Sequence, residues 1–370
     1  MGHRCGGNEP IRPSGTVSLC SRDGLSCGHE APSSLFDLRP DARMRRAGWF
    51  AAGLVGVAAI AWLLLGRLSP VAEPDHPVSV YDRAAAIALV DSIRTREGPE
   101  VNPDCHTRII ISDTSASRPV IVLLHGFTNC PKQFDRLAAD FAKAGYNVVL
   151  PLLPRHGLAD RMTTDLQGLR GEDLVRSGQA AIDIARGLGG PITVVGLSSS
   201  AVLAGWLAQH RSEVDCAVLL APSFAPPGCS APVARRLTVA MLQAPNFFIW
   251  WDPRVRADLP GPRQCYPRFA SHALAEVYRL GFTVLHDAGR AAPKSRKVIL
   301  VTSELDTAVN NDLSMELVRL WRARGADVQT FQFAANQGVR HDMIDPEQPY
   351  QRIGVSYPII EKLVTAAAAR

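Results

Sequence analysis

The chain has 370 residues, of which 46% are hydrophobic and 20% charged, and its net charge is +5. This is the composition of a globular protein, and the length allows one large α/β domain or two small ones. The cations are nearly all arginine and are scattered rather than clustered, so the positive charge does not indicate a nucleic-acid partner.

Residues 1–46 are rich in Gly, Ser, Pro, Arg and Cys and have no hydrophobic period. Such a composition cannot bury enough apolar surface to fold, so this segment is predicted to be disordered. It is absent from the protein altogether if translation starts at Met44.

Residues 47–66, "AGWFAAGLVGVAAIAWLLLG", carry no charge, with three arginines just before them and Arg67 just after. A helix of this length is about 30 Å long and crosses a bilayer. The upstream arginines predict a cytoplasmic N-terminus and place the rest of the chain outside the cytoplasm, in the periplasm or beyond the cell. A cleaved signal peptide beginning at Met44 is the alternative, but no A-x-A site follows the run, which favours an uncleaved transmembrane anchor.

Residues 67–80 contain three prolines and are predicted to be a linker, and residues 81–370 are predicted to form the folded domain. A helical pattern over Tyr81–Arg94 opens this domain. Short apolar runs then alternate with amphipathic helical stretches. The predicted strands are Thr107–Ser112, Val120–Leu124, Asn147–Leu150, Ile192–Val195, Ala217–Leu220, Lys297–Thr302 and Val328–Phe333. Continuous apolar strands that alternate with helices predict a mostly parallel sheet with helices on both faces.

The alternation stops between about residues 222 and 294. This stretch has many prolines, the aromatic run "NFFIWW" at 246–251 and one long helical pattern. It is too long for a loop, so we predict an inserted cap.

The strand ending at Val195 runs into Gly196-Leu197-Ser198-Ser199-Ser200, and a helical pattern begins at Ala201. This arrangement predicts a sharp strand-to-helix turn with Ser198 at its centre. The usual pattern is G-x-S-x-G, in which small neighbours let the strand and helix approach closely around a nucleophilic serine. Here Ser200 replaces the last glycine. A serine before a helix can also be a simple cap, so the motif alone does not decide.

A serine nucleophile needs a base and an acid that orients the base. After the strand "KVILVT" the chain offers Asp306, with Glu304 as an alternative, and after the strand "DVQTFQF" it offers His341. His210, His272 and His286 precede the acid in the chain and do not fit the order. The order Ser, acid, His, each after a strand, predicts a Ser198–Asp306–His341 triad.

The buried strand "VIVLL" ends in His125-Gly126-Phe127. Acyl transfer requires N–H donors where negative charge develops on the carbonyl oxygen. The backbone N–H groups of Phe127 and Ser199 are the predicted oxyanion hole. His125 is predicted to support the loop.

Five of the eight cysteines lie in the predicted domain, without the spacing of a metal site. In an oxidising compartment, Cys105 could pair with Cys130 and Cys229 with Cys265. Free, buried thiols are the alternative.

The motifs "LLHGFT", "PLLPRHG", "GLSSS", "LDTAV" and "RHDM" follow one another over nearly the whole domain. From about Asn102 onward the chain resembles the α/β-hydrolase superfamily. More narrowly it is similar to the serine aminopeptidase and monoacylglycerol lipase-like group of carboxylesterases and lysophospholipases. The resemblance implies the α/β-hydrolase fold, the same triad, a two-amide oxyanion hole and no cofactor or metal.

The predicted function is hydrolysis of a carboxylic ester or lipid by a serine esterase. The cap is expected to set acyl specificity. His156, Phe248, Trp250 and Trp251 are candidate pocket residues, although the three cap aromatics could simply pack the cap against the sheet. Two alternatives remain. One is an amidase or aminopeptidase with the same triad, for which Asp252 or Asp258 would recognise an amine. The other is a catalytically inactive binding module.

Overall fold

The computed structural model describes residues 49–51, 53, 56, 66–75, 80, 82–112 and 118–368. Internal contacts divide the chain into Met1–Val57 and Ala58–Arg370, and the fold below is that of the second unit. The predicted disordered segment, residues 1–46, and most of the predicted anchor, residues 47–66, lie outside the described residues. Among the residues that are described, no helix has both the length and the hydropathy of a membrane span.

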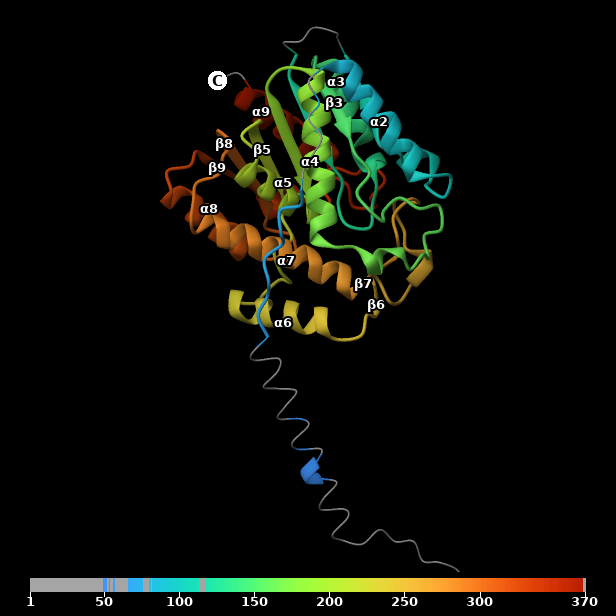
Figure 1. Cartoon of the computed structure of the whole chain (residues 1–370), viewed down its shortest axis with the longest axis vertical. Coiled ribbons are helices and arrows are strands. Elements are labelled where there is room, and N and C mark those ends of the chain that lie inside the picture. The colour runs from blue at the N-terminus through green and yellow to red at the C-terminus, as the bar shows by residue number, and fades with distance from the viewer. Residues whose placement is uncertain are drawn as a thin grey trace, which may run out of the picture. The chain divides into compact units, whose positions relative to one another are not determined.

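A sheet forms the centre of the described domain (Figure 1). It has seven strands in the order β1-β3-β2-β4-β5-β8-β9. Its strands are β1 (Arg108–Ile110), β2 (Val120–Leu124), β3 (Asn147–Leu150), β4 (Ile192–Leu197), β5 (Val214–Leu220), β8 (Lys297–Ser303) and β9 (Val328–Phe333). Only the edge strand β1 is antiparallel to its neighbour; the other pairings are parallel. The predicted mostly parallel sheet is therefore confirmed.

Helices cover both faces of the sheet because alternate residues of its buried strands point to opposite sides. In β2, Val120, Val122 and Leu124 join one apolar cluster, and Ile121 and Leu123 join the other. The first cluster contains α2 (Arg83–Glu97), α4 (Gly171–Leu188), α5 (Ser199–His210), α7 (Ser271–Ala288) and α8 (Asn311–Ala323). The second contains α3 (Asp135–Lys143) and α9 (Ile353–Ala368). Single 3₁₀ turns occur at Pro103–Cys105, Pro131–Phe134, Asp165–Gly168, Arg256–Asp258 and Ala335–Gln337.

The segment between β5 and β8 holds α6 (Ala231–Gln243), a small antiparallel pair of β6 (Phe248–Trp250) and β7 (Arg268–Ala270), and then α7. The predicted insertion at about 222–294 thus includes α7, which packs against α5 and α8 in the layer that covers the sheet. Two adjacent parallel strands require a crossover connection, and α7 supplies it between β5 and β8. The departure from strand–helix alternation is therefore confined to the part before α7.

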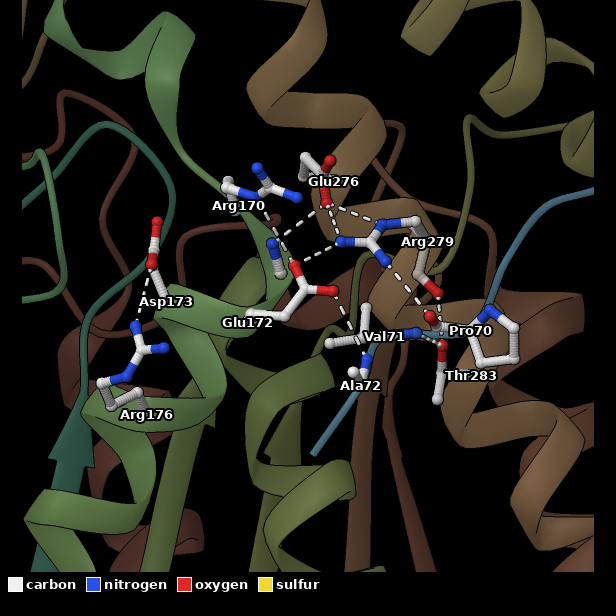
Figure 2. Close-up of polar contacts among 11 residues, drawn as sticks. Pro70, Val71, Ala72, Arg170, Glu172, Asp173, Arg176, Glu276, Arg279 and Thr283 are labelled. Atoms are coloured by element: carbon white, nitrogen blue, oxygen red, sulfur yellow. Dashed lines mark hydrogen bonds and ion pairs between the residues drawn. The ribbon is translucent and has the colours of Figure 1, made fainter. Parts of the chain in front are cut away.

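The predicted linker makes defined contacts with the domain. Pro70–Ala72, called here the docked segment, lies against α4 and α7 (Figure 2). The backbone N–H of Val71 donates to Thr283 Oγ1 at 2.9 Å. Val71 is 5% exposed, and a Cβ on Gly171 would come within 2.6 Å of its methyl group. The absence of a side chain at Gly171 therefore creates the space that Val71 fills.

Arg279 of α7 fixes the same segment by charge (Figure 2). Its guanidinium donates to the carbonyl of Pro70 at 3.2 Å and to the carboxylates of Glu172 and Glu276 at 2.6 and 2.7 Å. Arg279 is 8% exposed, so this ion cluster is largely withdrawn from water. Residues 70–72 are thus part of the folded domain rather than a free linker.

One of the two disulfide pairings considered from the sequence is present. Cys105 and Cys130 are bonded and join the turn before β1 to the loop after β2. Cys229 and Cys265 are free thiols, so the second pairing is wrong. Their surroundings differ: the Cys265 thiol lies 3.3 Å from Thr128 Oγ1, whereas the Cys229 carbonyl accepts a hydrogen bond from Asn310.

Candidate active site

The predicted strand-to-helix turn forms at Ser198, between β4 and α5. The φ of Ser198 is +60°, a strained value for a residue with a side chain. Gly196 makes the turn sterically feasible, because a Cβ there would lie 2.1 Å from the carbonyl oxygen of Ser200. The side chain of Ser198 does not cap α5, so the cap alternative for this serine is wrong.

Three loops at the carboxyl edge of the sheet bring Ser198, Asp306 and His341 together. His341 Nε2 lies 2.9 Å from Ser198 Oγ, and His341 Nδ1 lies 2.8 Å from Asp306 Oδ2. These residues follow β4, β8 and β9, which are in one parallel sheet with their carboxyl ends at the same edge. A hydroxyl, an imidazole and a carboxylate in this order can transfer a proton from the hydroxyl to the ring.

Charge around His341 favours its protonated form. Burial opposes protonation, but the hydrogen bond and charge of Asp306, together with the charge of Asp342, raise the pKa of the imidazole above its ordinary value. The side chain of Asp306 is fully buried in this pair. A carboxylate held in this way stabilises an imidazolium as it forms.

The two predicted oxyanion donors lie on neighbouring elements. Phe127 follows β2, and Ser199 is the first residue of α5, which follows β4; β2 and β4 pair in parallel, with Leu124 opposite Gly196. The N-terminal end of a helix carries partial positive charge, so the Ser199 N–H lies where an anion is stabilised.

His125 links the loop after β2 to the loop after β3. Its Nε2 accepts from the Leu153 N–H at 3.0 Å, so the proton is on Nδ1, which donates to the Gly126 carbonyl. Burial and the nearby His156 hold the pKa of His125 well below its usual value. The ring is therefore neutral and supports both loops, as its position after the strand suggested.

His156, one of the candidate pocket residues, packs against the loop after β2, residues 125–128, called here the oxyanion loop. Its ring centroid is 5.9 Å from that of Phe127, and its Nδ1 bonds to the Pro154 carbonyl. Burial lowers the pKa of His156 to about 4, so it carries no charge at neutral pH. His156 is 2% exposed and contributes an apolar ring face beside Phe127.

The three aromatic candidates on β6 and just after it divide into two groups, because neighbouring side chains on a strand point to opposite sides. The guanidinium of Arg268 lies over the rings of Phe248 and Trp250, at 4.5 and 5.7 Å. Trp251 instead points to the oxyanion loop: its Nε1 donates to Thr128 Oγ1 at 2.9 Å, and its ring lies 4.5 Å from Phe269. Trp251 remains 43% exposed.

Two other acidic candidates, Glu304 and Asp252, are engaged elsewhere. The carboxylate of Glu304, the alternative to Asp306, accepts from the Ala335 N–H, and only Asp306 contacts His341. Asp252 forms an ion pair with Arg254 at 2.7 Å. Of the excluded histidines, His210 pairs with Asp287 and His272 contacts the Ala244 carbonyl.

Sequence reasoning missed a buried polar network behind the three loops. Gln133 accepts from the Gly126 N–H at 2.7 Å and donates to Asp342 at 2.9 Å, and Asn129 donates to Asp345 at 3.2 Å. Burial and the charge of Asp342 raise the pKa of Asp345 to about 7. Asp342 directly follows His341 in the motif "RHDM", so its place beside the base was readable from the sequence. Its partnership with Gln133, which lies 209 residues away in the chain, had no signal in the sequence.

A mostly parallel sheet with helices on both faces and a serine turn at its carboxyl edge is the architecture of the α/β hydrolases. The chain belongs to the alpha/beta hydrolase family: the model of that family matches residues 121–353.

Among curated relatives, the chain is 34% identical over 94 residues to the thermostable monoacylglycerol lipase of Bacillus sp. (strain H-257). That match covers 25% of this chain and 36% of the lipase, so the chain spans about a third of that relative's length.

Two lipases are among the solved structures that share the fold. The soluble variant of monoglyceride lipase from Saccharomyces cerevisiae has 16% identity and a TM-score of 0.54, over 71% of this chain and 91% of that one. The monoacylglycerol lipase of Paleococcus ferrophilus has 17% identity and a TM-score of 0.51, over 70% and 98%.

Proposed function

We propose that the chain hydrolyses carboxylic esters, with Ser198 as nucleophile, His341 as general base and Asp306 as the residue that orients the base. One observation carries the proposal: His341 Nε2 is 2.9 Å from Ser198 Oγ while its Nδ1 is 2.8 Å from Asp306. Both distances are those of hydrogen bonds. The first allows the Ser198 proton to pass to the ring, and the second holds the ring in the orientation that accepts it.

In the first half of the reaction, Ser198 Oγ attacks the ester carbonyl carbon and its proton passes to His341 Nε2. The tetrahedral intermediate collapses, the bond to the alcohol oxygen breaks, and His341 gives that oxygen the proton. An acyl-enzyme remains on Ser198. Water then attacks the acyl carbon, again losing a proton to His341, and the carboxylic acid leaves as the proton returns to Ser198 Oγ.

Negative charge on the carbonyl oxygen is stabilised in both halves by the backbone N–H groups of Phe127 and Ser199. The support for this assignment is that both residues lie just after the carboxyl ends of the neighbouring strands β2 and β4, as Ser198 does. The loss of one such donor in an acyl-transfer enzyme typically costs about 3 kcal/mol of transition-state stabilisation.

The proposed substrate is an ester of a lipid, such as a monoacylglycerol. The similarity to a monoacylglycerol lipase over 94 residues supports it. So do the aromatic rings around the oxyanion loop: Phe269 lies 5.6 Å from Phe127 and 4.5 Å from Trp251, which is 43% exposed. Such rings bind acyl chains through apolar contact.

The test is hydrolysis of p-nitrophenyl esters from acetate to palmitate, and of a monoacylglycerol, by the chain and by Ser198→Ala. We expect turnover that varies with acyl length and that the Ser198→Ala substitution abolishes. Equal activity of the variant and the parent would disprove the mechanism.

Two further assays separate the alternatives. An amidase or aminopeptidase would turn over aminoacyl anilides faster than esters. A catalytically inactive module would not be labelled at Ser198 by a fluorophosphonate, which reacts only with an activated serine.

We also propose that residues 47–66 anchor the chain in a membrane and that the domain lies outside the cytoplasm. The uncharged run in the sequence and the Cys105–Cys130 disulfide support this location, because disulfides persist in oxidising compartments. Labelling of intact cells with a membrane-impermeant fluorophosphonate tests it: labelling only after lysis would contradict it.

A further inference from the structure

Ser200 occupies the position at which the nucleophile pattern usually has glycine, and its hydroxyl has a partner. Ser200 lies in the first turn of α5 and is 1% exposed. Its Oγ donates to the main-chain carbonyl of His125, in the loop after β2. The pairing of Leu124 with Gly196 in adjacent strands brings these two loops together.

Gln133 holds the other end of the same peptide unit. The peptide that joins His125 to Gly126 has the carbonyl of His125 at one side and the N–H of Gly126 at the other. That N–H donates to Gln133 Oε1 at 2.7 Å, and Gln133 is 3% exposed. Because a peptide unit is planar, hydrogen bonds at both its polar groups fix its orientation. The next peptide along carries the N–H of Phe127.

Gln133 also reaches the loop that carries the base. Its Nε2 donates to Asp342 Oδ2 at 2.9 Å, directly after His341. A single buried amide therefore connects the loop of Phe127 to the loop of His341. A buried network of this kind, with its polar atoms satisfied, keeps its members in one arrangement.

We propose that Ser200 and Gln133 are positioning residues that fix the His125–Gly126 peptide, so that the Phe127 N–H is aimed at the oxyanion before substrate arrives. This inference rests on the proposed function, because it assigns the Phe127 N–H to the oxyanion hole. The hydroxyl at position 200 then compensates for the missing glycine by tying the nucleophile turn to the oxyanion loop.

The inference predicts a specific kinetic signature. An oxyanion donor acts on charge that develops in the transition state, so a misdirected donor lowers kcat and leaves ground-state binding unchanged. Ser200→Ala and Ser200→Gly both remove the hydroxyl and should lower kcat about tenfold, less than the loss of a donor itself, with KM within about twofold. The pKa of the acidic limb of the rate profile should not move, since His341 keeps its partners.

Ser314→Ala is the matched control. Ser314 is equally buried in the first turn of another helix, α8, and its hydroxyl donates to the main-chain carbonyl of Asn310. Its kcat should equal that of the parent. Gln133→Met, which removes the acceptor for Gly126, is the second test variant and should lower kcat in the same way.

The experiment measures kcat, KM and the pH profile for p-nitrophenyl ester hydrolysis, with active sites counted by fluorophosphonate titration. It also measures inhibition by a trifluoromethyl ketone, whose adduct with serine carries an oxyanion. The inference predicts that the inhibition constant of Ser200→Ala rises by the same factor as kcat/KM falls. Unchanged kcat in both Ser200 variants, or a loss explained by fewer titratable sites, overturns it.

The outcomes distinguish the two proposals. If the parent hydrolyses esters through Ser198 and the Ser200 variants match it, the positioning inference fails alone. If the parent is labelled by the fluorophosphonate but hydrolyses no ester, the rate of labelling replaces kcat, and an equal rate in Ser200→Ala overturns the inference. If the parent neither hydrolyses esters nor is labelled, both proposals fall together.

Discussion

Asp342 adjoins His341 in the chain, and its negative charge helps to raise the pKa of the histidine ring. Its carboxylate does not contact the ring; it accepts hydrogen bonds from the side-chain amides of Gln133 and Gln348, both at 2.9 Å. Two negative charges therefore act on the base: the carboxylate of Asp306, which bonds to the ring, and the carboxylate of Asp342, which is held nearby.

The first prediction concerns pH. His341 accepts a proton only as the neutral ring, so activity falls as the pH drops through its raised pKa. Asp342→Asn keeps an oxygen for the two amides but removes the charge. The acidic limb of kcat/KM against pH should move to lower pH, while the plateau rate changes little. A limb that stays in place would show that Asp342 does not act on the base.

The second prediction concerns stability. The pKa of Asp345 rises from 3.8 in the unfolded chain to about 7 in the folded domain, because of burial and the charge of Asp342. The folded state therefore binds this proton more tightly. The resulting stability is complete below the unfolded pKa and is lost as the pH rises through the folded pKa.

Asp345→Asn is neutral at every pH and should avoid that loss. Relative to the parent, its free energy of unfolding should grow by up to about 1.4 kcal/mol per pH unit between pH 5 and 7 and then level off. Urea unfolding at several pH values measures it, with Asp173→Asn as a surface control. A difference that is constant with pH would contradict the prediction.

The third prediction concerns the docked segment. Arg279→Met removes the cation that bonds to Pro70, Glu172 and Glu276 and leaves two carboxylates in a poorly solvated cluster (Figure 2). We expect a loss of about 3 kcal/mol in the free energy of unfolding. Arg176→Met is the control: this arginine also pairs with a carboxylate, that of Asp173 at 3.1 Å, but its side chain is 58% exposed, so its loss should cost about 0.5 kcal/mol. Equal effects of the two substitutions would show that the buried ion cluster around Arg279 stabilises the domain no more than an exposed ion pair does.

The fourth prediction concerns the nucleophile turn. Gly196→Ala places a Cβ 2.1 Å from the Ser200 carbonyl oxygen, inside van der Waals contact. The backbone must shift, so fluorophosphonate labelling of Ser198 should be lost. Gly205→Ala, in the helix α5 that follows the turn, would place a Cβ no nearer than 3.4 Å to its first neighbour and should leave labelling unchanged. Normal labelling of Gly196→Ala would mean that the turn tolerates a side chain.

Several parts of the fold were readable from the sequence because burial on both faces leaves a continuous apolar run. The bounds of β2, β3 and β9 agree with the predicted strands at both ends, whereas β4 and β5 are longer than predicted by two and three residues. The nucleophile turn was readable because a sharp change from strand to helix leaves no room for a side chain at Gly196 and forces Ser198 into a strained backbone conformation. The order Ser198, Asp306, His341 followed from strand ends alone.

Other features depended on the order of strands in space. The pairing of β2 with β4 sets Ser200 against His125. The 3₁₀ turn Pro131–Phe134, which follows Cys130 of the disulfide, sets Gln133 between Gly126 and Asp342. Which of the considered cysteine pairs forms a disulfide, and how Pro70–Ala72 docks on α7, likewise depended on the tertiary structure.

The physical reason is how far apart in the chain the interacting residues lie. The sequence determined which segments are strands and helices and which residues end the strands, since burial period and backbone sterics act over a few neighbouring residues. The tertiary structure decided which strand ends meet and which buried amides, hydroxyls and carboxylates satisfy one another, because those partners lie up to 216 residues apart and become neighbours only when the sheet has formed.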